Sequence, residues 1–227
     1  MSQRRRRPTQ LGLDLAPRTW GGARKGAGRK PKGVVPHARR PEHVFRHPVH
    51  VTLRLARHVW NLRSQRGFAK IEEALRRTRA RGLVRIVHYS VQHDHIHMIV
   101  EADDRSTLAR GIKGFEVRLA WGLNELMRLK GRTFGDRYYA RALRSPREVR
   151  RVLVYVINNR VHHKPELEGL GYVDPYSSGS WFDGWTRRPA MAESACRSTG
   201  PPTHDGTVWL LTTGWRRHRL LVPGSMR

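Results

Sequence analysis

The sequence offers very little sulfur and no long apolar run. Its 227 residues include one cysteine, Cys196, which excludes an internal disulfide and a zinc site built from several thiolates. No run of about 18 apolar residues is present, and no apolar segment follows the basic N-terminus as it would in a secretory signal. We therefore expect an intracellular protein, in which any metal ion is held by histidine, carboxylate or amide groups.

Acidic residues are also scarce. The chain has 18 Asp and Glu against 45 Lys and Arg, which gives a formal charge of +27, while its 38% hydrophobic content is enough for a folded core. A field of this size favours a polyanionic partner. Nucleic acid is the expected partner, and no membrane association is expected.

Residues 1–47 are predicted to form a flexible basic arm. They contain "RRRR" at 4–7 and "GGARKGAGRKPKG" at 21–33, which are poor in apolar residues and rich in helix and strand breakers. A solubilising tail is the alternative, but the arginines and lysines favour phosphate contacts. The predicted DNA-binding residues of the arm are Arg24, Lys25, Arg29, Lys30 and Lys32.

Hydrophobic periodicity predicts six elements between residues 48 and 143. Alternation predicts strands and steps of three and four predict helices, in the order β-α-β-β-α-β: 50–56, 68–82, 83–92, 95–102, 106–131 and 133–143. This order is typical of an α+β, ferredoxin-like antiparallel sheet with helices on one face.

Two histidines stand one residue apart in the strand 95–102. With period two, His95 and His97 share a face with Glu101, while Ile96 and Met98 point to the core. The imidazoles lie close enough to bind one cation together, although a structural role is also compatible with the pattern.

A further helix is predicted over residues 145–163. Ser145, Pro146 and Glu148 form a strong start signal with a capping box. Tyr155 lies roughly 130° from the centre of the apolar stripe, so it is not a core tyrosine. It belongs to a polar stripe, for which a solvated face is the alternative: Arg151, Tyr155, Asn159 and His162.

Taken together, these motifs resemble the single-tyrosine HUH transposases, and most closely the REP-associated tyrosine transposases of bacteria. The resemblance covers about residues 21–163 and rests on "KGAGRKP", "HPVHVTLRL", "SVQHDHIHMIVEA", "FGDRYYARAL" and "YVINN". Two positions differ from the usual pattern: Asp94 replaces an asparagine before the first histidine, and Arg160 replaces a proline after Asn159.

The resemblance implies a DNA transposase of the bacterial cytoplasm, associated with the nucleoid. Its partner would be single-stranded, hairpin or repeat DNA, with Tyr155 as the nucleophile that forms a 5′-phosphotyrosine. His95, His97 and Asn159 would hold Mg²⁺ or Mn²⁺, and Arg151 would contact DNA. Either a monomer or a homodimer is compatible with the sequence.

The predicted organisation is an arm (1–47), a transposase and nuclease domain (48–163) and a Gly-, Pro- and Trp-rich extension (164–227), whose tryptophans pack or stack on bases. Glu101 is not expected to bind the metal, Tyr138 and Tyr139 are expected to pack at a strand, and His88 is expected to be structural or solvated. A non-catalytic module of RRM-like topology is the main alternative, but no aromatic RNP-type strand motif is present. A two-histidine RNA phosphoesterase would need a second histidine motif.

Overall fold

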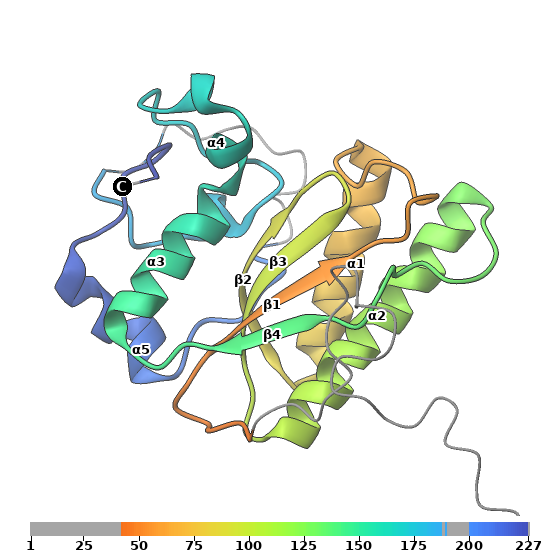
Figure 1. Ribbon diagram of the computed structural model, residues 1–227, viewed down its shortest axis with the longest axis horizontal. Coiled ribbons are helices and arrows are strands. Elements are labelled where there is room, and N and C mark those ends of the chain that lie inside the picture. The colour runs from red at the N-terminus through yellow and green to blue at the C-terminus, as the bar shows by residue number, and fades with distance from the viewer. Residues whose placement is uncertain (1–41, 188, 190–199, 227) are drawn as a thin grey trace, which may run out of the picture. The chain divides into compact units, whose positions relative to one another are not determined.

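The computed structural model describes residues 42–187, 189 and 200–226. The predicted arm residues up to 41, including the five named arginines and lysines, lie outside this range. Figure 1 shows the elements in chain order. They are β1 (Val49–Arg54), α1 (Gln65–Arg81), β2 (Arg85–Val91), β3 (His95–Glu101), α2 (Arg105–Met127), β4 (Tyr139–Ala142), α3 (Pro146–Ile157), α4 (Asn159–His163), α5 (Trp209–Thr212) and the 3-10 helices η1 (Pro165–Leu167), η2 (Ser178–Trp181) and η4 (Gly214–His218).

The four strands form one antiparallel sheet in the order β2-β3-β1-β4. Because β3 and β1 occupy the middle, side chains on both are held between neighbouring strands. The order β-α-β-β-α-β and the all-antiparallel pairing confirm the predicted α+β, ferredoxin-like fold.

Each long helix begins at a polar side chain. Ser64 accepts a hydrogen bond from the Gly67 amide at 3.1 Å, and Asp104 accepts one from the Thr107 amide at 2.7 Å. Gly82 ends α1 with φ +65°, a left-handed conformation that suits glycine. These caps explain why the predicted helix positions were close to the observed ones.

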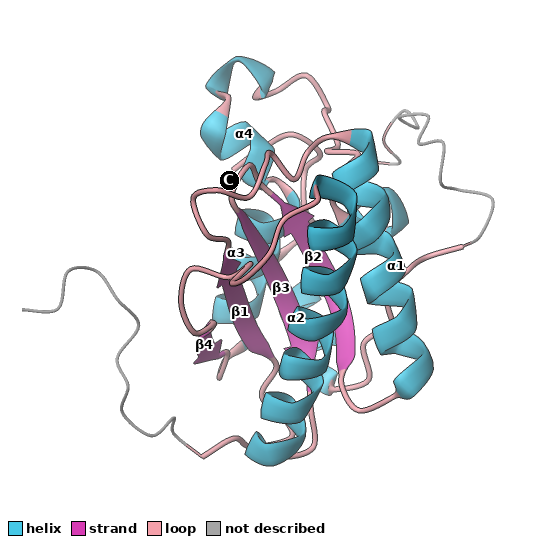
Figure 2. Cartoon of the chain, turned by 90° about the vertical axis from the view of Figure 1, so that its right-hand side faces the viewer, coloured by secondary structure: helices cyan, strands magenta, loops and turns pink. Residues whose placement is uncertain are grey.

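The sheet separates two hydrophobic cores. On one face α1 and α2 pack against Ile96, Met98 and Val100 of β3, and Figure 2 shows these two helices in front of the sheet. On the other face Ile99 of β3 packs with α3 and the C-terminal residues, among them Trp215. The alternation of β3 therefore turns His95 and His97 toward α3.

The C-terminal extension is an integral part of the second core. Trp185 and Trp215 are buried, as packing predicts, whereas Trp181 and Trp209 remain partly exposed. The edge strand β2 is covered, since the Val91 amide donates to the Tyr176 carbonyl at 2.9 Å.

No helix within the described ranges has the length and apolar character needed to cross a membrane.

Candidate active site

The site begins with two neighbouring strands. In the antiparallel register Thr52 of β1 lies opposite His97 of β3, and Arg54 lies opposite His95. The same face of β1 carries His50, whose ring centroid is 5.3 Å from that of His97. The centroids of His95 and His97 are 4.8 Å apart. The sheet therefore presents three imidazoles side by side.

His97 is held at both ring nitrogens. Its Nδ1 lies 3.2 Å from His50 Nε2 and 3.1 Å from Thr52 Oγ1, and its Nε2 lies 3.4 Å from the Tyr155 hydroxyl. Burial, with the positive charge of His50 and His95, lowers the pKa of His97 to about 3. Burial also lowers the pKa of His50 to about 4, with a smaller effect of Arg141. Both rings are therefore neutral at neutral pH, the form in which imidazole binds metal ions.

His95 is oriented by the residue before it. Its Nδ1 lies 2.8 Å from the Asp94 carboxylate. Although burial opposes ionisation of Asp94, the hydrogen bond and charge of His95 outweigh it and lower the pKa of Asp94. An ionised Asp94 accepts a hydrogen bond from Nδ1–H, which fixes the tautomer and leaves the lone pair on Nε2.

Tyr155 reaches this face from α3. The Ser145 hydroxyl accepts from the Glu148 amide at 3.3 Å, and Glu148 Oε2 accepts from the Arg144 amide at 2.7 Å, so the predicted start of the helix is confirmed. The Tyr155 ring is half-buried, with its centroid 5.0 Å from that of His97. A solvated face was the alternative for the polar stripe. At Tyr155 the stripe instead faces the histidines of the sheet.

The predicted single helix over 145–163 is wrong at its middle. α3 ends at Ile157 because Asn158 leaves the helical path, where its Nδ2 donates to the carbonyls of Val222 and Ser225 at 3.2 and 2.6 Å. The next helix is α4, which places the centroid of the His163 ring 6.1 Å from that of the His95 ring. Tyr155 and Asn159 therefore do not lie one turn apart on a single continuous helix.

Asn159, the first residue of α4, is an unusual buried side chain. It is 0% exposed, and neither Oδ1 nor Nδ2 has a hydrogen-bond partner in the described part of the chain. A buried amide without a partner costs about 1–3 kcal/mol. Packing within the described part of the chain therefore does not explain why an amide is buried at this position.

A protein-family model and solved structures match this chain. Residues 43–159, just over half of the chain, match the model of the family described as "Transposase IS200 like". This protein belongs to the IS200-like transposase family. The matched range contains the strand histidines, Tyr155 and Asn159. The predicted resemblance is confirmed.

A solved structure similar to this IS200-like transposase is that of a REP-associated tyrosine transposase bound to a REP hairpin. It has 16% identity and a TM-score of 0.52, with 79% of this chain and 97% of the other covered. A second, from Deinococcus radiodurans R1, is described as a putative transposase and has 14% identity, a TM-score of 0.36 and coverage of 52% and 87%. No curated protein matches the chain.

Basic residues of α3 and η4 form a small pocket in this transposase. Arg147, Arg150 and Arg151 of α3 and His218 of η4 line a cavity of about 280 Å³. Arg151 is exposed, one helical turn before Tyr155 in the sequence. This concentration of positive charge suits an anion such as phosphate.

The remaining candidate residues of the transposase have structural surroundings. Glu101 is 0% exposed and accepts from Arg85 Nε at 2.9 Å and from the Thr207 and Val208 amides at 2.9 and 3.0 Å. Tyr138 is buried, but Tyr139 is 47% exposed, so the expectation that Tyr139 packs is wrong. The His162 ring lies 6.0 Å from the Tyr155 ring.

Sequence reasoning missed His50, Thr52 and the partner role of Asp94. The signal was present, because the alternation in "HPVHVTLRL" puts His50 and Thr52 on one face of β1. The sequence pattern does not give the register between β1 and β3, which places Thr52 opposite His97.

Proposed function

We propose that this transposase is a metal-dependent single-strand DNA endonuclease and strand transferase that acts on hairpin or repeat DNA through a 5′-phosphotyrosine. The observation that carries the proposal is the approach of the Tyr155 hydroxyl to within 3.4 Å of His97 Nε2 in a chain of this family. Its substrate class is suggested by the similar structure solved with a REP hairpin.

The donor set fits a divalent ion. His95 and His97 offer imidazole nitrogens on one face, that of His97 being neutral, and Asn159 offers an amide oxygen with no partner in the described ranges. The described residues include no group of three or more His, Cys, Asp and Glu placed to hold a metal ion, and Asn159 would be a ligand of another type. Mg²⁺ or Mn²⁺, once bound there, would neutralise charge on the scissile phosphate and lower the pKa of a nearby hydroxyl.

The chain's own residues supply the nucleophile and its position. Tyr155 Oη attacks phosphorus and the bond to the 3′ oxygen breaks, so that the phenol loses a proton and the leaving 3′ oxygen gains one. Thr52 and His50 hold His97 in place, and Asp94 holds His95. The phosphotyrosine keeps the energy of the phosphodiester, so a second 3′-OH can reverse the step and join another strand.

The RRM-like alternative is less well supported. Such modules stack bases on aromatic rings of the sheet. Here the equivalent face carries imidazoles, and α3 with the C-terminal residues covers much of it. No described observation favours base stacking on the sheet over chemistry at the histidines.

The proposal is tested by trapping the covalent intermediate. Full-length protein, Mg²⁺ and labelled single-stranded hairpin oligonucleotides should give an adduct that resists SDS, with the nucleotide on the peptide "VLVYVINNR". EDTA and Tyr155→Phe should each abolish it, and Tyr139→Phe, at an exposed tyrosine of β4, should leave it intact. An adduct on another tyrosine, or one that forms in the Tyr155→Phe variant, would show that the assignment is wrong.

A further inference from the structure

A second charged surface lies on the other side of the sheet from Tyr155. α1 and α2 form a groove of about 850 Å³ on their outer surface, and its floor is lined by small residues such as Ala74, Gly114 and Gly122. A Cβ at Gly114 would lie 3.1 Å from an Arg118 nitrogen, and one at Gly122 would lie 3.2 Å from Lys70 Cδ. Glycine in a helix interior destabilises the helix, so these positions keep space at some expense of helix stability.

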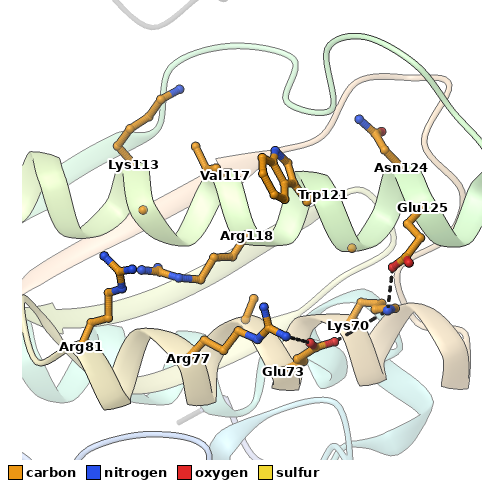
Figure 3. Close-up of a pocket in the computed structure, with 13 residues that line it drawn as sticks. Lys70, Glu73, Arg77, Arg81, Lys113, Val117, Arg118, Trp121, Asn124 and Glu125 are labelled. Carbon is orange, nitrogen blue, oxygen red and sulfur yellow. Dashed lines mark hydrogen bonds and ion pairs between the residues drawn. The ribbon is translucent and has the colours of Figure 1, made fainter.

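The lining of the groove has more positively charged side chains than carboxylates. At one end Lys70 lies 3.2 Å from Glu125, and Arg77 lies 2.7 Å from Glu73. At the other end Arg81 and Lys113 have no ion-pair partner among the described residues, and the guanidinium of Arg118 donates a hydrogen bond to the Thr78 hydroxyl at 3.2 Å. Figure 3 shows the guanidinium groups of Arg81 and Arg118 side by side.

The cost of this arrangement appears at Arg118. Burial lowers its pKa, and the positive charges of Arg81 and Arg77 lower it further. Like charges that are held together without a counter-charge are destabilising unless an anion joins them. The arginine end of the groove is therefore suited to phosphate.

An exposed tryptophan lies beside the arginines. Trp121 is 76% exposed, and Figure 3 shows its indole between Val117 and Asn124 on α2. It is three residues from Arg118, which is less than one helical turn. A flat aromatic face next to phosphate-binding groups is how proteins bind single strands, because every unpaired base can stack and every nucleotide carries a phosphate.

We propose that the α1–α2 groove binds a single-stranded stretch of DNA, with its phosphates at Arg81, Lys113 and Arg118 and a base on Trp121. Bases in a duplex are already stacked on both faces, so Trp121 favours an unpaired strand. A second copy of this chain fits poorly, since it carries the same charge of +27. The proposal extends the proposed function by a second DNA surface, and it rests on the family acting on DNA rather than on Tyr155 being the nucleophile.

The test separates the groove from the catalytic site. Full-length Tyr155→Phe protein in EDTA is titrated with labelled oligothymidylate, and a photoreactive thymine analogue is cross-linked to it. We expect cross-links in the tryptic peptide "LAWGLNELMR", and Trp121→Ala should weaken binding by about tenfold. Trp60→Ala, which removes another exposed tryptophan that does not line the groove, should not change binding.

Variants that change the charge of the groove test whether DNA binding there depends on its positive charge. Arg81→Gln and Lys113→Gln should each lower the salt dependence by about 0.7 in the slope of log K against log salt, while Glu125→Gln should strengthen binding. Three results would overturn the proposal: cross-links only outside the groove, equal and Trp121-independent binding of duplex DNA, or displacement of the oligonucleotide from Trp121 by polyglutamate at lower concentration than by unlabelled oligothymidylate. A failed adduct experiment would leave these outcomes unaffected, because none depends on cleavage.

Discussion

The side chains around His97 differ in how well their polar atoms are satisfied. His97 has a neighbour at each ring nitrogen, and His95 has Asp94 at Nδ1. Asn159 has no such neighbour in the described ranges, although it is fully buried. A buried amide without hydrogen bonds destabilises the fold, so its presence indicates a role other than folding.

Asn159→Leu should therefore separate stability from metal binding. Leucine has nearly the same shape and needs no hydrogen bond, so the free energy of unfolding in EDTA should rise by about 1 kcal/mol. Mn²⁺ affinity, measured by calorimetry, should fall at least tenfold. The adjacent Asn158→Leu is the matched control: it removes a donor to two carbonyls and should destabilise the protein. Unchanged Mn²⁺ affinity in Asn159→Leu would exclude the amide as a ligand.

His88 gives a prediction about pH. Its Nδ1 lies 3.3 Å from Ser178 Oγ, and burial lowers its pKa to about 4, against smaller opposing effects of Asp183 and Glu101. The folded ring stays neutral while the unfolded ring takes up a proton below about pH 6.5. This contribution to stability is thus complete above pH 6.5 and is lost as the pH falls toward 4.

Urea unfolding in EDTA at several pH values between 7.5 and 4.5 measures this effect. His88→Gln, which keeps a hydrogen-bonding group toward Ser178, should show a shallower loss of stability than the wild type, by up to about 1.4 kcal/mol per pH unit. Parallel curves for the two proteins would mean that the pKa of His88 is the same in the folded and the unfolded state.

Among the elements, those set by local signals were predictable from the sequence. The strands follow from alternation, and α3 begins at Ser145 because a capping box needs only neighbouring residues. The end of α3 was not predictable, since Asn158 leaves the helix to donate to carbonyls more than 60 residues away. His50 beside His97 depended in the same way on the register between β1 and β3.

Glu101 joins two elements that the sequence does not relate. It receives hydrogen bonds from Arg85 on β2 and from the Thr207 and Val208 amides just before α5, and α5 and η4 pack on α3. We name this contact between Glu101 and residues 207–208 the C-terminal clamp.

Glu101→Gln should weaken the clamp. The substitution leaves Arg85 and two backbone amides without a charged acceptor, so the free energy of unfolding should fall by about 3 kcal/mol. Hydrogen exchange should increase first at residues 207–215. Glu125→Gln, which changes an exposed glutamate of α2, is the control for the lost charge. Equal stability of the two variants would show that the clamp contributes little.

For the whole molecule, one chain supplies every group of the candidate site. His50, His97 and Tyr155 come from β1, β3 and α3 of the same chain and lie in direct contact. We therefore predict that one chain is sufficient for strand cleavage.

Mixing two inactive variants tests this arrangement. His97→Ala and Tyr155→Phe should each be inactive, and their mixture should remain inactive in strand cleavage, because no chain carries both groups. Recovery of cleavage in the mixture would instead mean that α3 is exchanged between two chains.

The C-terminal clamp also has a consequence for biosynthesis. The ribosome completes β3 and then α3 before it reaches Thr207, which follows Tyr155 by 52 residues. At about 5–20 residues per second, Tyr155 precedes the clamp by roughly 3–10 s, and the histidines precede it by longer. During that interval the nascent chain has Tyr155 on α3 but lacks α5 and η4, which pack on that helix in the folded protein. Translation that stops before residue 207 would thus yield a chain with His95, His97 and Tyr155 but without the hydrogen bonds from residues 207 and 208 to Glu101.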